Sequence, residues 1–111
     1  MKNKNFDLFK KECNKWIKKL ELSNYDIEFK YKKDSDFDGP YISTQADYNA
    51  TIYYQDYLED NSPANIKAGA KHEIIHLLLG RLSNAAYTRF TTKESVAYAE
   101  EEVVRKLAKL L

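Results

Sequence analysis

The chain has 111 residues, the length of one domain with a single modest core, and we expect one domain over residues 1–111. Its hydrophobic content of 43% excludes a disordered chain, and its net charge of +1 argues against a dedicated nucleic-acid-binding protein. No apolar run approaches the roughly 20 residues of a membrane span, and the first residues lack the apolar stretch of a secretory signal. One cysteine excludes an internal disulfide, so we expect a protein of the reducing cytoplasm with no membrane partner.

The near-zero net charge conceals three blocks of unlike charge. Residues 34–62 contain seven acidic residues and no lysine or arginine, whereas the segments on either side, 1–33 and 63–111, are net basic. Seven lysines lie between Lys2 and Lys19, on the polar side of a predicted helix and without an aromatic platform beside them. We interpret both the acidic block and these lysines as solvated surface, and we do not expect a nucleic-acid partner.

The first two predicted elements are a helix and a strand. Apolar residues recur at helical spacing over residues 6–22, from Phe6 through Cys13 to Leu20, which predicts an amphipathic helix. Cys13 lies on the apolar stripe, so we interpret it as a small core residue rather than a reactive thiol. Residues 25–33 then alternate between apolar and charged side chains, a pattern typical of a half-buried strand.

A turn and two further strands are predicted next. The turn covers residues 34–40, with the sequence DSDFDGP. The strands cover about 41–48 and 50–57, with a hairpin between Asp47 and Asn49. Together with the first strand they would form a small, mainly antiparallel sheet.

Two helices complete the chain. Ser62 followed by Pro63 is a typical helix start, because serine caps the free N–H groups and proline suits the first helical position. That helix is predicted to end near residue 82, before a polar connection. Thr91 and Glu94 have the spacing of a capping box and open the last helix. The element order predicts an α+β domain with three main helices.

The strongest chemical signal is the run HEIIH at 72–76. His72 and His76 are four residues apart on a predicted helix, so both imidazoles lie on one face and can reach one metal ion. Glu73 lies about 100° round the helix from His72, where its carboxylate can act as general base towards water. The helix is apolar on nearly all sides, so we expect these side chains to be buried and therefore metal-bound or paired. The alternative is a hydrogen-bonded histidine pair without metal.

A catalytic zinc needs a third protein ligand, and no histidine remains, so we expect a carboxylate from the last helix. The apolar stripe of that helix consists of Val96, Val103, Val104, Leu107 and Leu111. Glu100 falls in the middle of this stripe, whereas Glu101 and Glu102 fall outside it. We therefore predict one Zn²⁺ held by His72, His76 and Glu100, with Glu101 as the alternative ligand and water in the fourth position.

These motifs resemble a known family. HEIIH followed 24 residues later by a helical glutamate resembles the zincin metallopeptidases of the gluzincin type. HEIIHLLL and the ending AEEEVVRKLAKLL are similar to the small metallopeptidases of phages and prophages, and more distantly to the repressor-cleaving ImmA/IrrE proteins, whose Glu-Ala-Asn segment is absent here. The resemblance implies a minimal zincin-like fold and a zinc-dependent peptidase of peptide or protein substrates, with Glu73 as general base. It also implies a phage-encoded enzyme that acts in the cytoplasm of the host cell.

The acidic turn partly matches a calcium-binding loop. Asp34, Asp36 and Asp38 match the start of a calcium-binding loop, but Gln45 stands where that loop needs glutamate. We interpret the segment as a tight acidic turn and do not expect calcium there.

The remaining parts of a peptidase site are less specified by the sequence. Tyr87 and Arg89, in the predicted connection after the HEIIH helix, are the candidates for stabilising the oxyanion. A substrate is predicted to lie extended along an exposed sheet edge formed by the strand at 50–57. Three functions stay open: an active zinc peptidase, a zinc-binding zincin-fold regulatory or protein-interaction module with little turnover, and a small interaction domain without metal.

Overall fold

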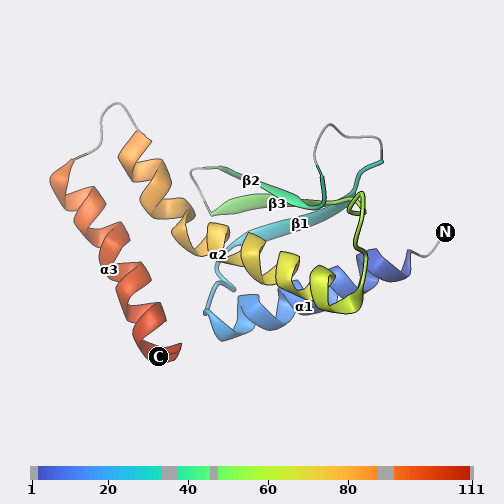
Figure 1. Cartoon of the computed structure of the whole chain (residues 1–111). Coiled ribbons are helices and arrows are strands. Elements are labelled where there is room, and N and C mark those ends of the chain that lie inside the picture. The colour runs from blue at the N-terminus through green and yellow to red at the C-terminus, as the bar shows by residue number, and fades with distance from the viewer. Residues whose placement is uncertain (1–2, 34–37, 46–47, 88–91, 111) are drawn as a thin grey trace.

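The structure is a computed structural model that describes residues 3–33, 38–45, 48–87 and 92–110. The described elements, in chain order, are α1 (Lys4–Lys19), β1 (Asp26–Tyr31), β2 (Tyr41–Gln45), β3 (Asn49–Tyr54), α2 (Pro63–Tyr87) and α3 (Lys93–Leu110). They form two layers, with the sheet on one side and α1 and α2 on the other, while α3 lies beside the C-terminal half of α2 (Figure 1). The prediction of an α+β domain is confirmed.

The sheet has three strands in the order β1, β3, β2. β3 pairs with β1 in a parallel arrangement, in which Ile52 of β3 lies opposite Phe29 of β1. β3 pairs with β2 in an antiparallel arrangement, in which Ile52 lies opposite Ile42 of β2. The sheet is therefore mixed, and the prediction of a mainly antiparallel sheet is corrected. The predicted edge strand at 50–57 is also corrected, because β3 is the central strand and the described edges are β1 and β2.

β3 is central because it contributes the most to the core. Ala50, Ile52 and Tyr54 point to the helical layer and are buried, as the period of two predicts. The Tyr54 ring packs against Phe9 of α1, with 4.9 Å between ring centroids. Burying each large side chain of this kind stabilises the fold by roughly 1.5–3 kcal/mol, so the strand with most buried residues is favoured at the centre.

The helical layer covers the sheet with one apolar face from each helix. α1 contributes Phe9, Cys13 and Ile17, which confirms Cys13 as a core residue. The buried apolar side chains of α2 include Ile66, Ala70, Ile74 and Leu77. These positions repeat every three or four residues, so the helical period read from the sequence is the one that the core uses.

α2 begins where the sequence predicts and ends later. Ser62 caps it, since its hydroxyl accepts a hydrogen bond from the Asn65 N–H at 3.3 Å, and Pro63 is its first residue. The helix continues through Ala85 and Ala86 to Tyr87, beyond the predicted end near residue 82. The extra turn has two alanines, the best helix formers, and no proline or glycine to stop it.

α3 begins one residue away from the predicted cap. The hydroxyl of Thr92, not Thr91, accepts the hydrogen bond from the Ser95 N–H at 3.1 Å, and Lys93 is the first helical residue. A threonine at either position offers the same hydroxyl, so the sequence alone does not choose between them.

The buried face of α3 differs from the predicted stripe. Ala99, Glu102 and Val103 are buried, whereas Val104 and Leu107 are 49% and 39% exposed. Val103 is therefore buried as predicted, but a small side chain and a polar one take the other buried positions. Ala99 permits a close approach, and the ion pair of Glu102 with Lys106, at 3.6 Å, compensates the burial of the carboxylate.

Candidate functional site

Two imidazoles converge on one face of α2. The Nε2 atoms of His72 and His76 are 3.2 Å apart, within hydrogen-bond distance, with the donor set by the tautomers, and their rings are inclined by 78°. Both side chains are exposed, which corrects the expectation that the whole motif would be buried. Two nitrogens bound to one tetrahedral zinc at 2.0–2.1 Å would be separated by about 3.3 Å. The spacing of the two imidazoles therefore fits two ligands of a common zinc ion.

Glu73 is the buried member of the motif, with only 7% of its surface exposed. Its burial raises the pKa of the carboxyl from its ordinary value to about 7. Cys13 of α1 lies on the core side of it. Burial, and then the charge of Glu73, raise the pKa of the Cys13 thiol. Glu73 thus stands at the boundary between the core and the histidine face.

A groove of about 400 Å³ runs along α2 beside the motif. Its polar lining comes from Asp38, Tyr57, Asn65, His72 and Glu73, and its floor includes small residues of α2. The Asp38 carboxylate accepts a hydrogen bond from the Leu58 N–H at 2.9 Å, which fixes the segment before β2 against the segment after β3. The groove therefore lies between two connecting segments and the helix that carries HEIIH.

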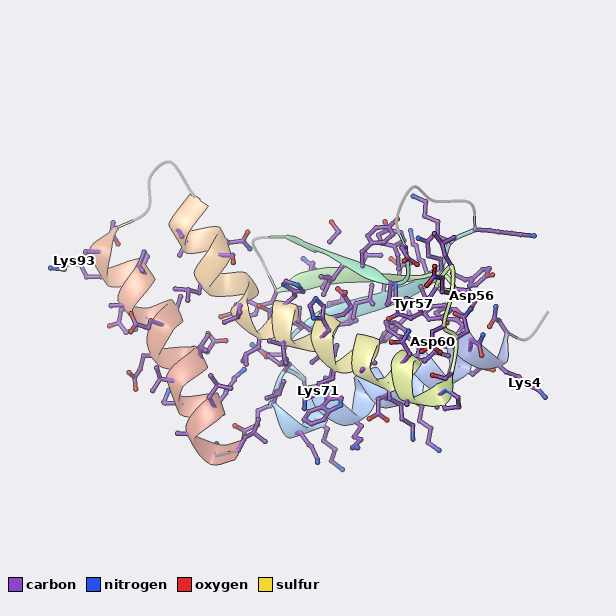
Figure 2. All side chains as sticks on the ribbon, in the orientation of Figure 1. Lys4, Asp56, Tyr57, Asp60, Lys71 and Lys93 are labelled. Carbon is purple, nitrogen blue, oxygen red and sulfur yellow. The ribbon has the colours of Figure 1, made fainter. Side chains whose placement is uncertain are left out.

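Tyr57 is the residue of this groove that the sequence did not single out. It lies with Asp56 and Asp60 where β3 ends and α2 begins (Figure 2). A Cβ on Gly39 would overlap its ring, and a Cβ on Gly69 would overlap its hydroxyl. Burial, and then the charges of Glu73 and Asp38, raise the pKa of Tyr57. Two of the three glycines of the chain thus accommodate one tyrosine. Their spacing gives no sequence signal, because the contact is tertiary.

The predicted carboxylate ligands lie elsewhere. Glu100 and Glu101 are exposed on α3, and Glu102 is the buried glutamate of that helix. Among the described residues, no group of three or more His, Cys, Asp or Glu side chains is placed to hold a metal ion. The structure thus brings His72 and His76 together but brings no α3 glutamate to them.

The other predicted site residues fall at or outside the limits of the described residues. Tyr87 is the last residue of α2 rather than part of a connection, about 16 Å along the helix axis from His76. The side chain of Tyr87 and the whole of Arg89 lie outside the described residues. So do Asp34 and Asp36 of the acidic turn that partly matches a calcium-binding loop.

The lysines of α1 have an aromatic neighbour that the sequence did not predict. The ammonium groups of Lys15, Lys19 and Lys71 lie 5.5, 5.1 and 4.9 Å from the Trp16 ring centroid. Trp16 is only half-exposed, and its Nε1 is buried without a hydrogen-bond partner among the described residues. The ring is covered by lysines and therefore does not offer an open face for stacking bases.

Comparison with protein-family models, with curated proteins and with solved structures finds no match to this chain in any of the three. In the part of the chain that the structure describes, no helix is both long and apolar enough to cross a membrane.

Proposed function

We propose that this protein is a zinc-dependent peptidase with a zincin-like site on α2. The observation that carries the proposal is the 3.2 Å separation of the His72 and His76 Nε2 atoms beside a buried glutamate at position 73. Exposed imidazoles could each bond to water, so burial does not force them together. In this structure a hydrogen bond between the two rings holds them together, and the same separation suits two nitrogens that share one zinc ion.

The imidazoles of His72 and His76 would hold the zinc, with Glu100 of α3 as the predicted third ligand and Glu101 as its alternative. A zinc ion in such a site lowers the pKa of a water ligand to about 7 and polarises a carbonyl oxygen. Asp38 is the carboxylate that lines the groove in addition to Glu73, so it is the natural comparison for the α3 glutamates.

Glu73 would act as the general base. Its carboxylate takes one proton from water while the water oxygen bonds to the peptide carbonyl carbon. It then returns the proton to the amide nitrogen as the C–N bond breaks, which yields one carboxylic acid and one amine. In the metal-free fold, burial raises the pKa of this carboxyl to about 7, and a general base is most effective when its pKa lies near the operating pH.

The substrate would lie extended along β2 rather than along the central strand β3. β2 is an edge of the described sheet, and it begins directly after Pro40, which lines the groove. Main-chain hydrogen bonds to an edge strand need no specific side chain, so they suit peptides of many sequences.

A zinc-binding module with little turnover is the second candidate. It is favoured by the exposure of Glu100 on α3, away from the histidines, which leaves the ligand set incomplete in this arrangement.

The test combines zinc content with peptide hydrolysis. We expect one equivalent of zinc in protein purified without chelator, and cleavage of a mixed peptide library by the parent. Glu73→Gln should keep the zinc and lose hydrolysis by several orders of magnitude, because it preserves shape and removes the base. Equal cleavage by both proteins would exclude Glu73 as base. Zinc in both with cleavage by neither would favour the binding module, and no zinc in either would exclude the proposal.

A further inference from the structure

We propose that the Tyr57 hydroxyl donates the hydrogen bond that stabilises the oxyanion in this groove, the role that the sequence assigned to Tyr87 or Arg89. This inference rests on the proposed function, since it needs a carbonyl oxygen beside the zinc ligands. Three features of the structure carry it: how the ring is held, where the hydroxyl lies and what the hydroxyl is free to do.

The ring is held in one place by backbone. Gly39 has a backbone φ of +79°, which residues other than glycine rarely adopt. Because it has no Cβ, the Tyr57 ring can occupy the space beside it. The backbone of Tyr57 is fixed as well, because its N–H donates to the Asn61 Oδ1 at 2.8 Å and its carbonyl accepts from the Asn61 Nδ2 at 3.0 Å. A donor fixed in this way needs little reorganisation during a reaction.

The hydroxyl lies over the helix face that carries the chemistry. It occupies the position where a side chain on Gly69 would be. Gly69 is one helical turn before Glu73 and on the same face, and at about 100° per residue it falls between His76 and Glu73 around the helix. Tyr57, His72 and Glu73 line one groove. The phenol therefore lies over the helix backbone at Gly69, in the groove that His72 and Glu73 also line.

The hydroxyl is free to donate. No described residue forms a hydrogen bond with it, and it is not among the buried polar atoms, so it faces the open groove. The other uncharged polar side chain of the lining, Asn65, already donates to the Asp60 carbonyl at 2.7 Å. Asp38 and Glu73 supply carboxylate oxygens. Among the described lining residues, Tyr57 is therefore the one with an uncommitted O–H donor.

The test uses three variants of the zinc-loaded full chain. Tyr57→Phe removes only the hydroxyl, and Gly69→Ala displaces it while improving helix propensity. Tyr31→Phe on the far edge strand β1 is the matched control. One readout is peptide turnover, and the other is the affinity of acetohydroxamic acid, whose oxygen bound beside the zinc can accept the same hydrogen bond.

We expect Tyr57→Phe to lower turnover by roughly 100-fold and hydroxamate affinity by roughly tenfold, with zinc affinity and thermal unfolding unchanged. Gly69→Ala should lower both in the same direction, and Tyr31→Phe should lower neither. Unchanged hydroxamate affinity in Tyr57→Phe would overturn the inference, as would a loss explained by weaker zinc binding. If the parent cleaves no peptide, the peptidase proposal fails, but the hydroxamate comparison still decides the role of Tyr57. If the parent binds no zinc, both fail.

Discussion

At the residue scale, one helix places three side chains of the same motif in different surroundings. His72 and His76 are exposed, whereas Glu73 is buried among core residues. The helical period separates Glu73 from His72 by about 100° around the helix, and the packing of α2 decides that the Glu73 side is the buried one. Residues suited to binding a cation are thus accessible, and the residue suited to proton transfer is shielded from water.

The raised pKa of Glu73 predicts how the stability of metal-free protein depends on pH. A carboxyl with a pKa of about 7 in the folded state and about 4.5 in the unfolded state stabilises the fold when protonated. That stabilisation is fully present below pH 4.5 and is lost as the pH rises through 7, by up to about 3 kcal/mol. With EDTA present, chemical denaturation should show the free energy of unfolding of the parent falling relative to Glu73→Gln between pH 5 and pH 8. A constant difference between the two proteins would contradict the assignment.

At the element scale, the rotation of α3 decides which glutamate is structural. Glu102 is buried beside the turn after α1, and its ion-pair partner Lys106 donates a hydrogen bond to the Glu21 carbonyl of that turn at 2.8 Å. Glu100 lies on the exposed side with Val104 and Leu107, the residues that the sequence assigned to the core. The exposed Glu100 carboxylate is therefore available to bind a metal ion. The Glu102 carboxylate is less available, because it already forms an ion pair with Lys106.

The three consecutive glutamates of α3 therefore separate zinc binding from stability. Glu102→Ala should lower the free energy of unfolding by roughly 1–3 kcal/mol, since it removes the charged partner of Lys106. Glu100→Ala should leave stability unchanged and weaken zinc binding far more than Glu101→Ala does.

Zinc titration and denaturant unfolding of the three proteins measure the two effects, with Asp38→Asn as the control for the groove. Equal loss of zinc affinity in all three alanine variants would refute the assignment of Glu100, and a loss confined to Asp38→Asn would move the third ligand to the groove.

At the scale of the whole molecule, the site joins parts that are distant in the chain. The groove needs the segment before β2, the segment after β3 and the first turns of α2. Only the folded domain brings them together, so a ligand of this site binds the folded state in preference to the unfolded state.

Zinc should consequently stabilise the whole domain. At a free concentration 100 times its dissociation constant, a ligand specific for the folded state adds about 2.7 kcal/mol to the free energy of unfolding. Differential scanning calorimetry should show a higher Tm with zinc for the parent and for Glu73→Gln. His72→Ala should abolish the increase, and a full increase in that variant would place the zinc elsewhere.

The local features of this protein could be predicted from short stretches of its sequence. The helical stripe of α1, the cap at Ser62, the alternation of β3 and the pairing of His72 with His76 all follow from periods and spacings within a few residues. Backbone geometry fixes these relations wherever the segment lies in the fold. For this reason the α+β class and the two converging imidazoles were predictable.

The features that depend on segments distant in the chain could not be predicted in this way, because they are set by packing. The central position of β3, the buried face of α3 and the placement of Tyr57 between Gly39 and Gly69 each depend on which surfaces meet. Several strand orders and helix rotations satisfy the same local pattern, and the choice among them follows from the total apolar area that they bury. Contacts between residues far apart in the chain leave no periodic pattern in the sequence. The position of the Tyr57 hydroxyl in the groove that Glu73 lines is such a contact, so it could be found only in the folded structure.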